Sequence, residues 1–219
     1  METKTLNSDL YYEVMGQGEP LVMIHGNGED SSIFVKAAQL LKHKYKVYLI
    51  DSVNHGKSIY VDVYSYEDMA TRLLGLLDAL KLHSFHYFGF SDGGIIGLML
   101  AKEYPERFKS LMIAGANLFT SGIISSELNK YREIYQKTLD PLLGLMLGQT
   151  PIDPLELNKI TCPTLVLCGE FDVIKLNHTK LIHASLPEST LQIVANHNHT
   201  SYVVDNELVV TIILSFLCK

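Results

Sequence analysis

The sequence predicts an α/β fold in which a mostly parallel β-sheet carries helices on both faces. Short apolar runs alternate with stretches of helical spacing along most of the chain. Most of these runs are apolar at consecutive positions, as strands buried on both faces must be. The chain has 219 residues, of which 47% are apolar and 19% charged. We therefore expect one domain, residues 1–219, that is large enough to bury a substantial core.

The strand predictions rest on apolar segments that are bounded by turn residues. Residues 11–16 precede the turn at Gly16-Gln17-Gly18 and predict an edge strand. Six further runs predict the strands of the parallel sheet: 21–25, 46–51, 84–90, 110–114, 164–169 and 190–194.

Predicted helices fill the intervals between these strands. Ser65 can cap a helix whose apolar stripe comprises Met69, Leu73, Leu76, Leu77 and Leu80. Residues 95–103 and 208–217 predict two more helices. Regular strand–helix alternation implies parallel strands, and such sheets bind ligands at the carboxyl ends of their strands.

Residues 117–159 interrupt the alternation. They contain no convincing strand, and Pro141, Pro151 and Pro154 divide them into short helices. We interpret the segment as an insertion over the sheet rather than as a separate domain. Its apolar residues 142–147 could line a pocket, but packing of the insertion on the sheet is the favoured interpretation.

Charge and composition exclude several kinds of partner. Eighteen basic and 24 acidic residues give a net charge of −6, and no segment is strongly basic, so we do not expect nucleic acid binding. No apolar run approaches the roughly 20 residues that span a bilayer, so we expect no membrane partner. Cys162, Cys168 and Cys218 lie in apolar segments and predict buried thiols in a reducing compartment, hence a cytoplasmic protein.

The strongest local signal is Gly89-Phe90-Ser91-Asp92-Gly93, a G-x-S-x-G pattern between a predicted strand and a predicted helix. A serine on a sharp strand-to-helix turn projects its hydroxyl above the sheet, at a helix N-terminus that favours developing negative charge. Ser91 is therefore a candidate nucleophile. The alternative is a glycine-rich turn with an incidental serine.

A serine needs a base to remove its proton and a carboxylate to orient that base. Asp172 follows the strand at 164–169 and is the candidate carboxylate, with Glu170 as a weaker rival. The base should follow the last predicted strand, where His197 and His199 compete. A histidine pair could also bind a metal, but no third ligand at a characteristic spacing accompanies it.

The turn His25-Gly26-Asn27-Gly28 leaves the first parallel strand and can direct backbone N–H groups inward. We predict an oxyanion hole formed by the backbone N–H groups of Asn27 and Asp92. The side chain of His25 is expected to be structural. Asp51 and His55 are expected to shape a loop rather than to catalyse.

From about residue 11 to residue 217 the chain resembles the α/β-hydrolase superfamily. It has, in the family's order, an HG-x-G turn at 25–28, a D-x-x-x-H-G-K-S turn at 51–58, the G-x-S-x-G elbow, a G-x-x-D loop at 169–172 and a late histidine. The resemblance implies that Ser91 is the nucleophile and Asp172 the triad acid. The run His199-Thr200-Ser201-Tyr202 resembles the H-x-S-Y pattern of small members, in which the triad histidine comes first, and this favours His199 over His197. Residues 117–159 take the position of the family's cap.

These observations predict a serine hydrolase that cleaves a small carboxylic ester, an amide or a thioester through an acyl-enzyme. We expect a small-molecule substrate with an apolar group, no cofactor and no metal. Two kinds of alternative remain. One is another enzyme on this scaffold, such as an acyltransferase, a lyase or a cofactor-free haloperoxidase. The other is a ligand-binding protein with a slow triad.

Overall fold

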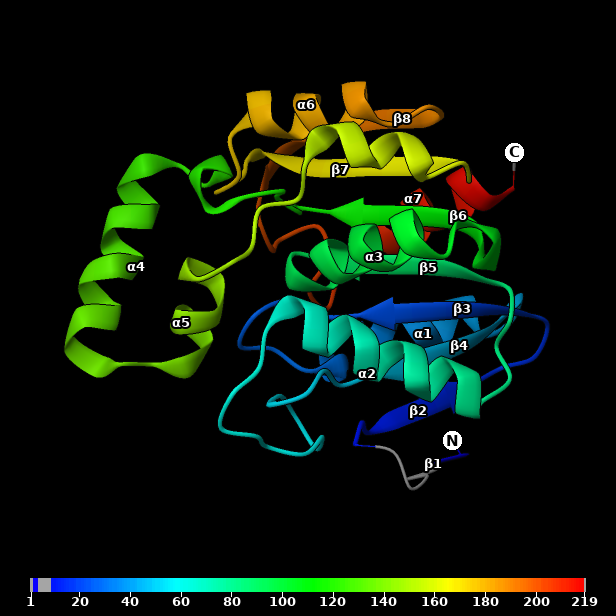
Figure 1. Cartoon of the computed structure of the whole chain (residues 1–219). Coiled ribbons are helices and arrows are strands. Elements are labelled where there is room, and N and C mark those ends of the chain that lie inside the picture. The colour runs from blue at the N-terminus through cyan, green and yellow to red at the C-terminus, as the bar shows by residue number, and fades with distance from the viewer. Residues whose placement is uncertain (1, 4–8, 219) are drawn as a thin grey trace.

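The computed structural model describes residues 2–3 and 9–218, and its described strands form one sheet in the order β1-β2-β4-β3-β5-β6-β7-β8 (Figure 1). Strands β1 (Glu2–Thr3) and β2 (Tyr12–Met15) are antiparallel to their neighbours. The other six pair in parallel: β3 (Glu19–Ile24), β4 (Tyr45–Ile50), β5 (Phe85–Phe90), β6 (Phe108–Ala114), β7 (Thr164–Phe171) and β8 (Ser189–Asn198). The mostly parallel α/β fold is therefore confirmed.

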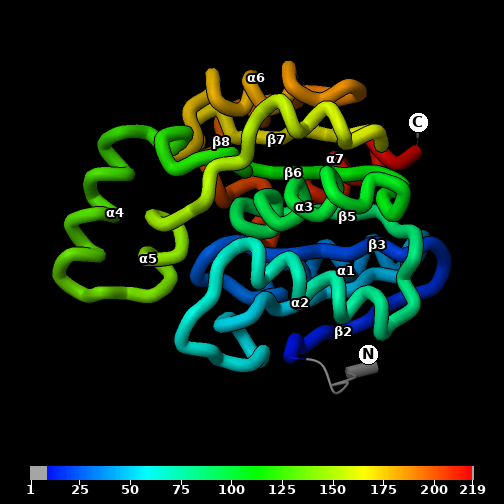
Figure 2. Tube along the Cα trace, viewed as in Figure 1, coloured from blue at the N-terminus to red at the C-terminus, as the bar shows by residue number. Residues whose placement is uncertain are grey.

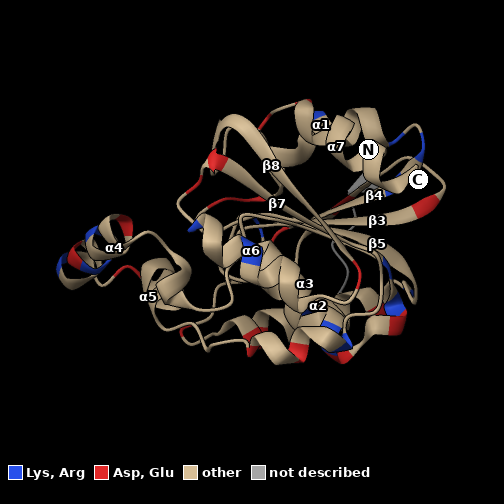
Figure 3. Cartoon of the chain, turned by 90° about the horizontal axis from the view of Figure 1, so that it is seen from above, with Lys and Arg blue, Asp and Glu red and all other residues tan. Residues whose placement is uncertain are grey.

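Helices cover both faces of the sheet, as Figure 3 shows from above. Helices α1 (Val35–Leu41) and α7 (Leu208–Leu217) pack on one face, and α2 (Tyr66–Ala79), α3 (Asp92–Glu103) and α6 (Leu176–Ser185) pack on the other. Successive residues of a strand pack into the apolar cores on opposite faces of the sheet, as the two-residue period of a strand requires. In β3, Leu21 and Met23 join the core under α1 and α7, while Val22 and Ile24 join the core under α2 and α3.

The predicted start of α2 is confirmed, because the Ser65 hydroxyl accepts a hydrogen bond from the Asp68 N–H at 3.2 Å. Helix α3 begins at Asp92, three residues earlier than predicted. Its first turn contains Gly93 and Gly94, and glycine is a weak helix former, so the sequence pattern does not reveal this turn. The early start places the helix N-terminus directly after Ser91.

Residues 117–159 contain no strand of the sheet. They form the short 3-10 helix η3 (Thr120–Gly122), then α4 (Ser125–Thr138), α5 (Pro141–Leu147) and the 3-10 helix η4 (Pro154–Lys159). Helices α4 and α5 lie beyond the carboxyl ends of the parallel strands (Figures 1 and 2). Pro141 and Pro154 are the first residues of α5 and η4, positions at which a missing N–H costs little.

Other details also differ from the sequence prediction. Strand β8 continues to Asn198, four residues past its predicted end, because an edge strand can carry exposed polar residues. Strand β7 continues to Phe171. Cys162 and Cys168 are buried, but Cys218 is exposed, because it follows the last turn of α7.

Ser31–Phe34 forms the 3-10 helix η1, and Pro105–Arg107 forms η2. Within the described part of the chain, no helix combines the length and the apolar character that crossing a bilayer requires.

Candidate active site

Ser91 occupies a strained turn between β5 and α3. Its backbone has φ 50° and ψ −112°, a region that residues with a side chain rarely adopt. The Ser91 N–H donates to the Ala114 carbonyl at 2.7 Å, and the Gly93 N–H donates to the His25 carbonyl at 3.1 Å. A Cβ atom at Gly89 or Gly93 would lie 2.2 Å from a backbone oxygen, so glycine is required on both sides of the serine. The turn is thus fastened to both neighbouring strands.

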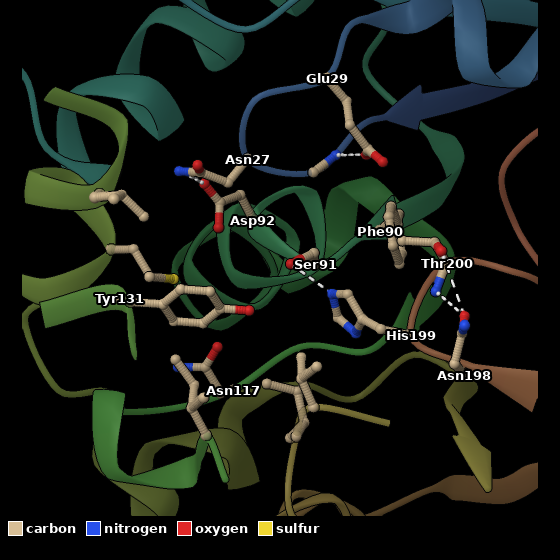
Figure 4. Close-up of a pocket in the computed structure, with 16 residues that line it drawn as sticks. Asn27, Glu29, Phe90, Ser91, Asp92, Asn117, Tyr131, Asn198, His199 and Thr200 are labelled. Carbon is tan, nitrogen blue, oxygen red and sulfur yellow. Dashed lines mark hydrogen bonds between the residues drawn. The ribbon is translucent and has the colours of Figure 1, made fainter. Parts of the chain in front are cut away.

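His199 lies between Ser91 and Asp172, as Figure 4 shows for the serine. Its Nε2 is 3.2 Å from Ser91 Oγ, and its Nδ1 is 2.7 Å from Asp172 Oδ1. The buried Asp172 carboxylate also accepts the N–H groups of Gly169 and Ile174, at 3.1 and 3.0 Å. This geometry allows Asp172 to accept the Nδ1–H of the imidazole, leaving Nε2 free to take a proton from the serine hydroxyl.

Two glycines make room for His199 and for the two residues that precede it. A Cβ atom at Gly115, which has φ 64°, would lie 2.6 Å from His199 Cε1. A Cβ atom at Gly169 would lie 2.5 Å from the carbonyl oxygens of His197 and Asn198. In the sequence, the residues that follow β6 are Gly115, Ala116 and Asn117, so no carboxylate is available there as a triad acid. The structure shows that Gly115 must lack a side chain altogether.

The rival residues lie elsewhere. His197 Nδ1 is paired with Ser201 Oγ at 3.0 Å, and the Glu170 carboxylate accepts the Asn196 N–H at 2.8 Å. The Ser91 hydroxyl is hydrogen-bonded to His199 rather than to either of these two residues. Among the described residues, no group of three metal-ligating side chains comes together.

Three residues near the first turns have the structural roles expected of them. His25 is buried, its Nδ1 contacts the Gly26 carbonyl at 2.8 Å, and its Nε2 accepts the Ser52 N–H at 3.0 Å. Burial lowers the pKa of His25 to about 4. The Asp51 carboxylate accepts two backbone N–H groups, and His55 Nε2 accepts the Gly28 N–H.

The backbone N–H groups of Asn27 and Asp92 have no acceptor among the described residues. Their side chains are joined, because Asn27 Nδ2 donates to Asp92 Oδ2 at 3.0 Å and to the Leu142 carbonyl at 3.1 Å. Tyr66 donates its hydroxyl proton to Asp92 Oδ1 at 2.8 Å. Burial raises the pKa of Asp92, while the hydrogen bonds from Tyr66 and Asn27 oppose that rise. The network connects both predicted oxyanion donors to α2 and α5.

A pocket of about 440 Å³ opens above Ser91 (Figure 4). Its apolar wall comes from the sheet, the loop after β7 and the insertion, and includes Phe90, Ile123, Leu143, Met146, Val173 and Ile174. The favoured interpretation of residues 142–147 as plain packing is therefore incomplete for Leu143 and Met146, which line the pocket, although Met146 also packs against Ile123, Leu128 and Ile174. It holds for Leu145, which is buried in the core under α2 and α3. Helical spacing alone does not tell which side of a two-turn helix faces the sheet.

The polar lining residues that sequence reasoning missed include Glu29, Asn117 and Tyr131. Glu29 comes directly after the HG-x-G turn, and Asn117 lies in the loop that follows β6. Both residues lie in loops at the carboxyl ends of strands, and this position could have identified them from the sequence as candidate pocket residues. Tyr131 comes from α4 and could be placed only by the structure.

The sequence matches the family described as alpha/beta hydrolase fold over residues 19–143, more than half of the chain. The chain belongs to the α/β-hydrolase fold family. The expectation of an enzyme of this family is thereby confirmed.

Relatives of the chain are named hydrolases and esterases. A protein of Azorhizobium caulinodans named as a carbamate hydrolase is 34% identical over 108 residues, which are 49% of this chain and 41% of that protein. The chain thus matches less than half the length of this relative. A pimeloyl-[acyl-carrier protein] methyl ester esterase of Legionella pneumophila is 25% identical and is aligned over 95% of this chain and 99% of its own length.

Solved structures agree on the fold. An esterase from Thermogutta terrifontis superposes with a TM-score of 0.79 at 22% identity, covering 95% of this chain and 93% of that one. At this identity the likeness concerns the fold alone.

Proposed function

We propose that the protein is a serine hydrolase that cleaves a small carboxylic ester through an acyl-enzyme, with Ser91 as nucleophile, His199 as base and Asp172 as the acid that orients it. The observation that carries the proposal is the continuous contact from Ser91 Oγ through the imidazole of His199 to the Asp172 carboxylate. Three side chains from separate loops meet in the order that acyl transfer requires.

The first half of the reaction forms the acyl-enzyme. Ser91 Oγ bonds to the ester carbonyl carbon while its proton passes to His199 Nε2. The carbonyl oxygen becomes an oxyanion, which the N–H groups of Asn27 and Asp92 stabilise. When the carbonyl re-forms, the bond to the alcohol oxygen breaks, and that oxygen takes the proton from His199. Asp172 stabilises the transient imidazolium by its contact with Nδ1.

Water completes the cycle. It loses a proton to His199 Nε2 and adds its oxygen to the acyl carbon. The bond to Ser91 Oγ then breaks, Oγ recovers the proton and the carboxylic acid leaves. The chain's own residues supply every proton transfer, so this scheme uses no cofactor and no metal.

The substrate in this proposal is a small ester with an apolar group, since Leu143 and Met146 contribute to the pocket wall. The names of the relatives point to carbonyl compounds of the same kind, a carbamate in one case and a methyl ester in another. Residues 117–159 act as a short cap on a single domain, because residues of α4 and α5 line the pocket. The buried free thiols of Cys162 and Cys168 fit a reducing compartment, and we place the protein in the cytoplasm.

A panel of 4-nitrophenyl esters of increasing acyl length tests the proposal. We expect turnover with an initial burst of nitrophenol, and a fall in kcat of about 10⁴-fold or more in Ser91→Ala. Turnover that survives in Ser91→Ala would contradict the nucleophile. Product that forms only when an alcohol acceptor is added would indicate transfer instead of hydrolysis.

A further inference from the structure

The Glu29 carboxylate lies near the proposed nucleophile. A Cβ atom placed on Gly26 would be 2.9 Å from Glu29 Oε2 and 3.0 Å from Ser91 Cβ, so these two atoms are no more than about 6 Å apart. Glu29 Oε2 is held in place by the Gly26 N–H at 3.1 Å. Its Oε1 has no hydrogen-bond partner in the described part of the chain, and Glu29 lines the pocket (Figure 4). When it is ionised, this carboxylate therefore has one oxygen that no side chain of the described residues neutralises through a hydrogen bond.

No residue that lines this pocket is Lys or Arg. The other carboxylate of the lining, Asp92, is already paired at both oxygens, with Tyr66 and Asn27. Burial raises the pKa of Glu29, and the opposing effects come from the Gly26 N–H and from the charge of His199. A cation in the pocket would gain its strongest partner at Glu29, whereas an anion would be repelled.

The position of Glu29 relative to His199 indicates which part of the substrate it meets. The leaving alcohol oxygen takes its proton from His199 Nε2, so the alcohol must lie on the imidazole side of Ser91. In Figure 4, Glu29 is drawn above Ser91 and His199 below it, both to the right of the serine, with Asn27 and Asp92 to its left, and the charge of His199 acts on Glu29. The ring of Tyr131 also lines the pocket and offers an aromatic surface of the kind that attracts cations.

We propose that Glu29 makes this a site for esters whose alcohol part carries a positively charged amino group. The proposal rests on the proposed function and specifies its substrate class. It predicts that a cationic alcohol is preferred over a neutral alcohol of the same shape, and that a carboxylate in the same place is disfavoured.

A matched pair of thioesters tests this preference. Butyrylthiocholine carries a quaternary nitrogen, and 3,3-dimethylbutyl thiobutyrate has carbon in its place. In the unmodified protein we expect kcat/KM for the cation to exceed that for the neutral ester by about tenfold or more. In Glu29→Gln this ratio should fall by about tenfold. The glutamine oxygen can still accept the Gly26 N–H, so this variant removes the charge and retains the hydrogen bond. Glu133→Gln, on the exposed surface of α4, removes one charge outside the pocket and should leave the ratio unchanged.

A ratio near one in the unmodified protein, or an equal ratio in Glu29→Gln, would overturn the proposal. If neither thioester is hydrolysed, the rate of Ser91 labelling by a fluorophosphonate gives the answer. Choline at millimolar concentration should slow labelling of the unmodified protein, but not of Glu29→Gln, and 3,3-dimethylbutanol should slow neither. Labelling that choline does not slow would overturn the inference about Glu29. A protein that is not labelled at Ser91 at all would instead refute the proposed function.

Discussion

Ser91 combines a reactive hydroxyl with a backbone conformation that is costly for any residue with a side chain. Its φ of 50° and ψ of −112° persist because hydrogen bonds and close packing hold the turn on both sides. Strain of this kind typically costs about 1–3 kcal/mol. This strained conformation directs the Ser91 hydroxyl toward His199.

Removal of this strain should stabilise the protein while it abolishes activity. We expect Ser91→Gly to raise the free energy of unfolding by about 1 kcal/mol or more relative to Ser91→Ala, because glycine adopts positive φ freely. Both variants lack the hydroxyl, so the difference between their free energies of unfolding reports the cost of the backbone conformation at residue 91. Urea unfolding curves of the two variants measure it, and equal midpoints would show that the turn is not strained.

At the residue scale, sequence reasoning locates candidates where a function requires a particular residue type in a particular strand-to-loop context. Ser91, Asp172 and His199 meet this condition, and the structure brings the three together. Glu29 and Gly115 do not, since a glutamate in a turn and a glycine after a strand are common in loops of every kind. Their roles depend on which segments approach them in space.

Helix α5 is the element for which sequence and structure differ most. Its leucines have helical spacing, but a seven-residue helix that touches both the core and a pocket has no single buried face. The strands are easier to predict from the sequence than this helix, because their apolar runs are bounded by turn residues. The end of strand β8 is harder to predict, because its last four residues are not an apolar run. The strand nevertheless continues beside β7: after an irregularity in the register, Asn198 pairs with Phe171.

The pocket wall on α5 should control acyl-chain preference. Met146→Ala enlarges the pocket, so we expect the kcat/KM ratio of a hexanoyl to an acetyl 4-nitrophenyl ester to rise by an amount equivalent to about 1–3 kcal/mol. Leu143→Ala should act in the same direction. Leu155→Ala, 78% exposed on η4, is the matched control and should have no effect. An unchanged ratio in both pocket variants would place the acyl chain elsewhere.

The stability of the whole molecule should depend on two histidines that are buried and uncharged. Burial lowers the pKa of His25 and of His178 to about 4, from an ordinary value of 6.5. Between these values the unfolded chain binds protons that the folded protein does not. The free energy of unfolding should therefore fall as the pH drops from 6.5 to 4, by about 3 kcal/mol for each histidine.

His178→Gln separates this effect from the titration of carboxylates. The glutamine side chain can still accept the Leu118 N–H that His178 Nε2 accepts at 2.9 Å. We expect its unfolding free energy to lose about 3 kcal/mol less than that of the unmodified protein between pH 6.5 and 4. His43→Gln, at an exposed position, is the control. Parallel pH profiles for the unmodified protein and His178→Gln would show that this histidine does not contribute.

Covalent capture of the nucleophile tests the central claim most directly. The folded protein is incubated with a fluorophosphonate, and its intact mass and the modified peptide are measured. We predict one adduct per chain, on Ser91, which forms far more slowly in His199→Gln and does not form in Ser91→Ala. A folded protein that stays unmodified, or that carries its adduct on another residue, would contradict the proposed triad.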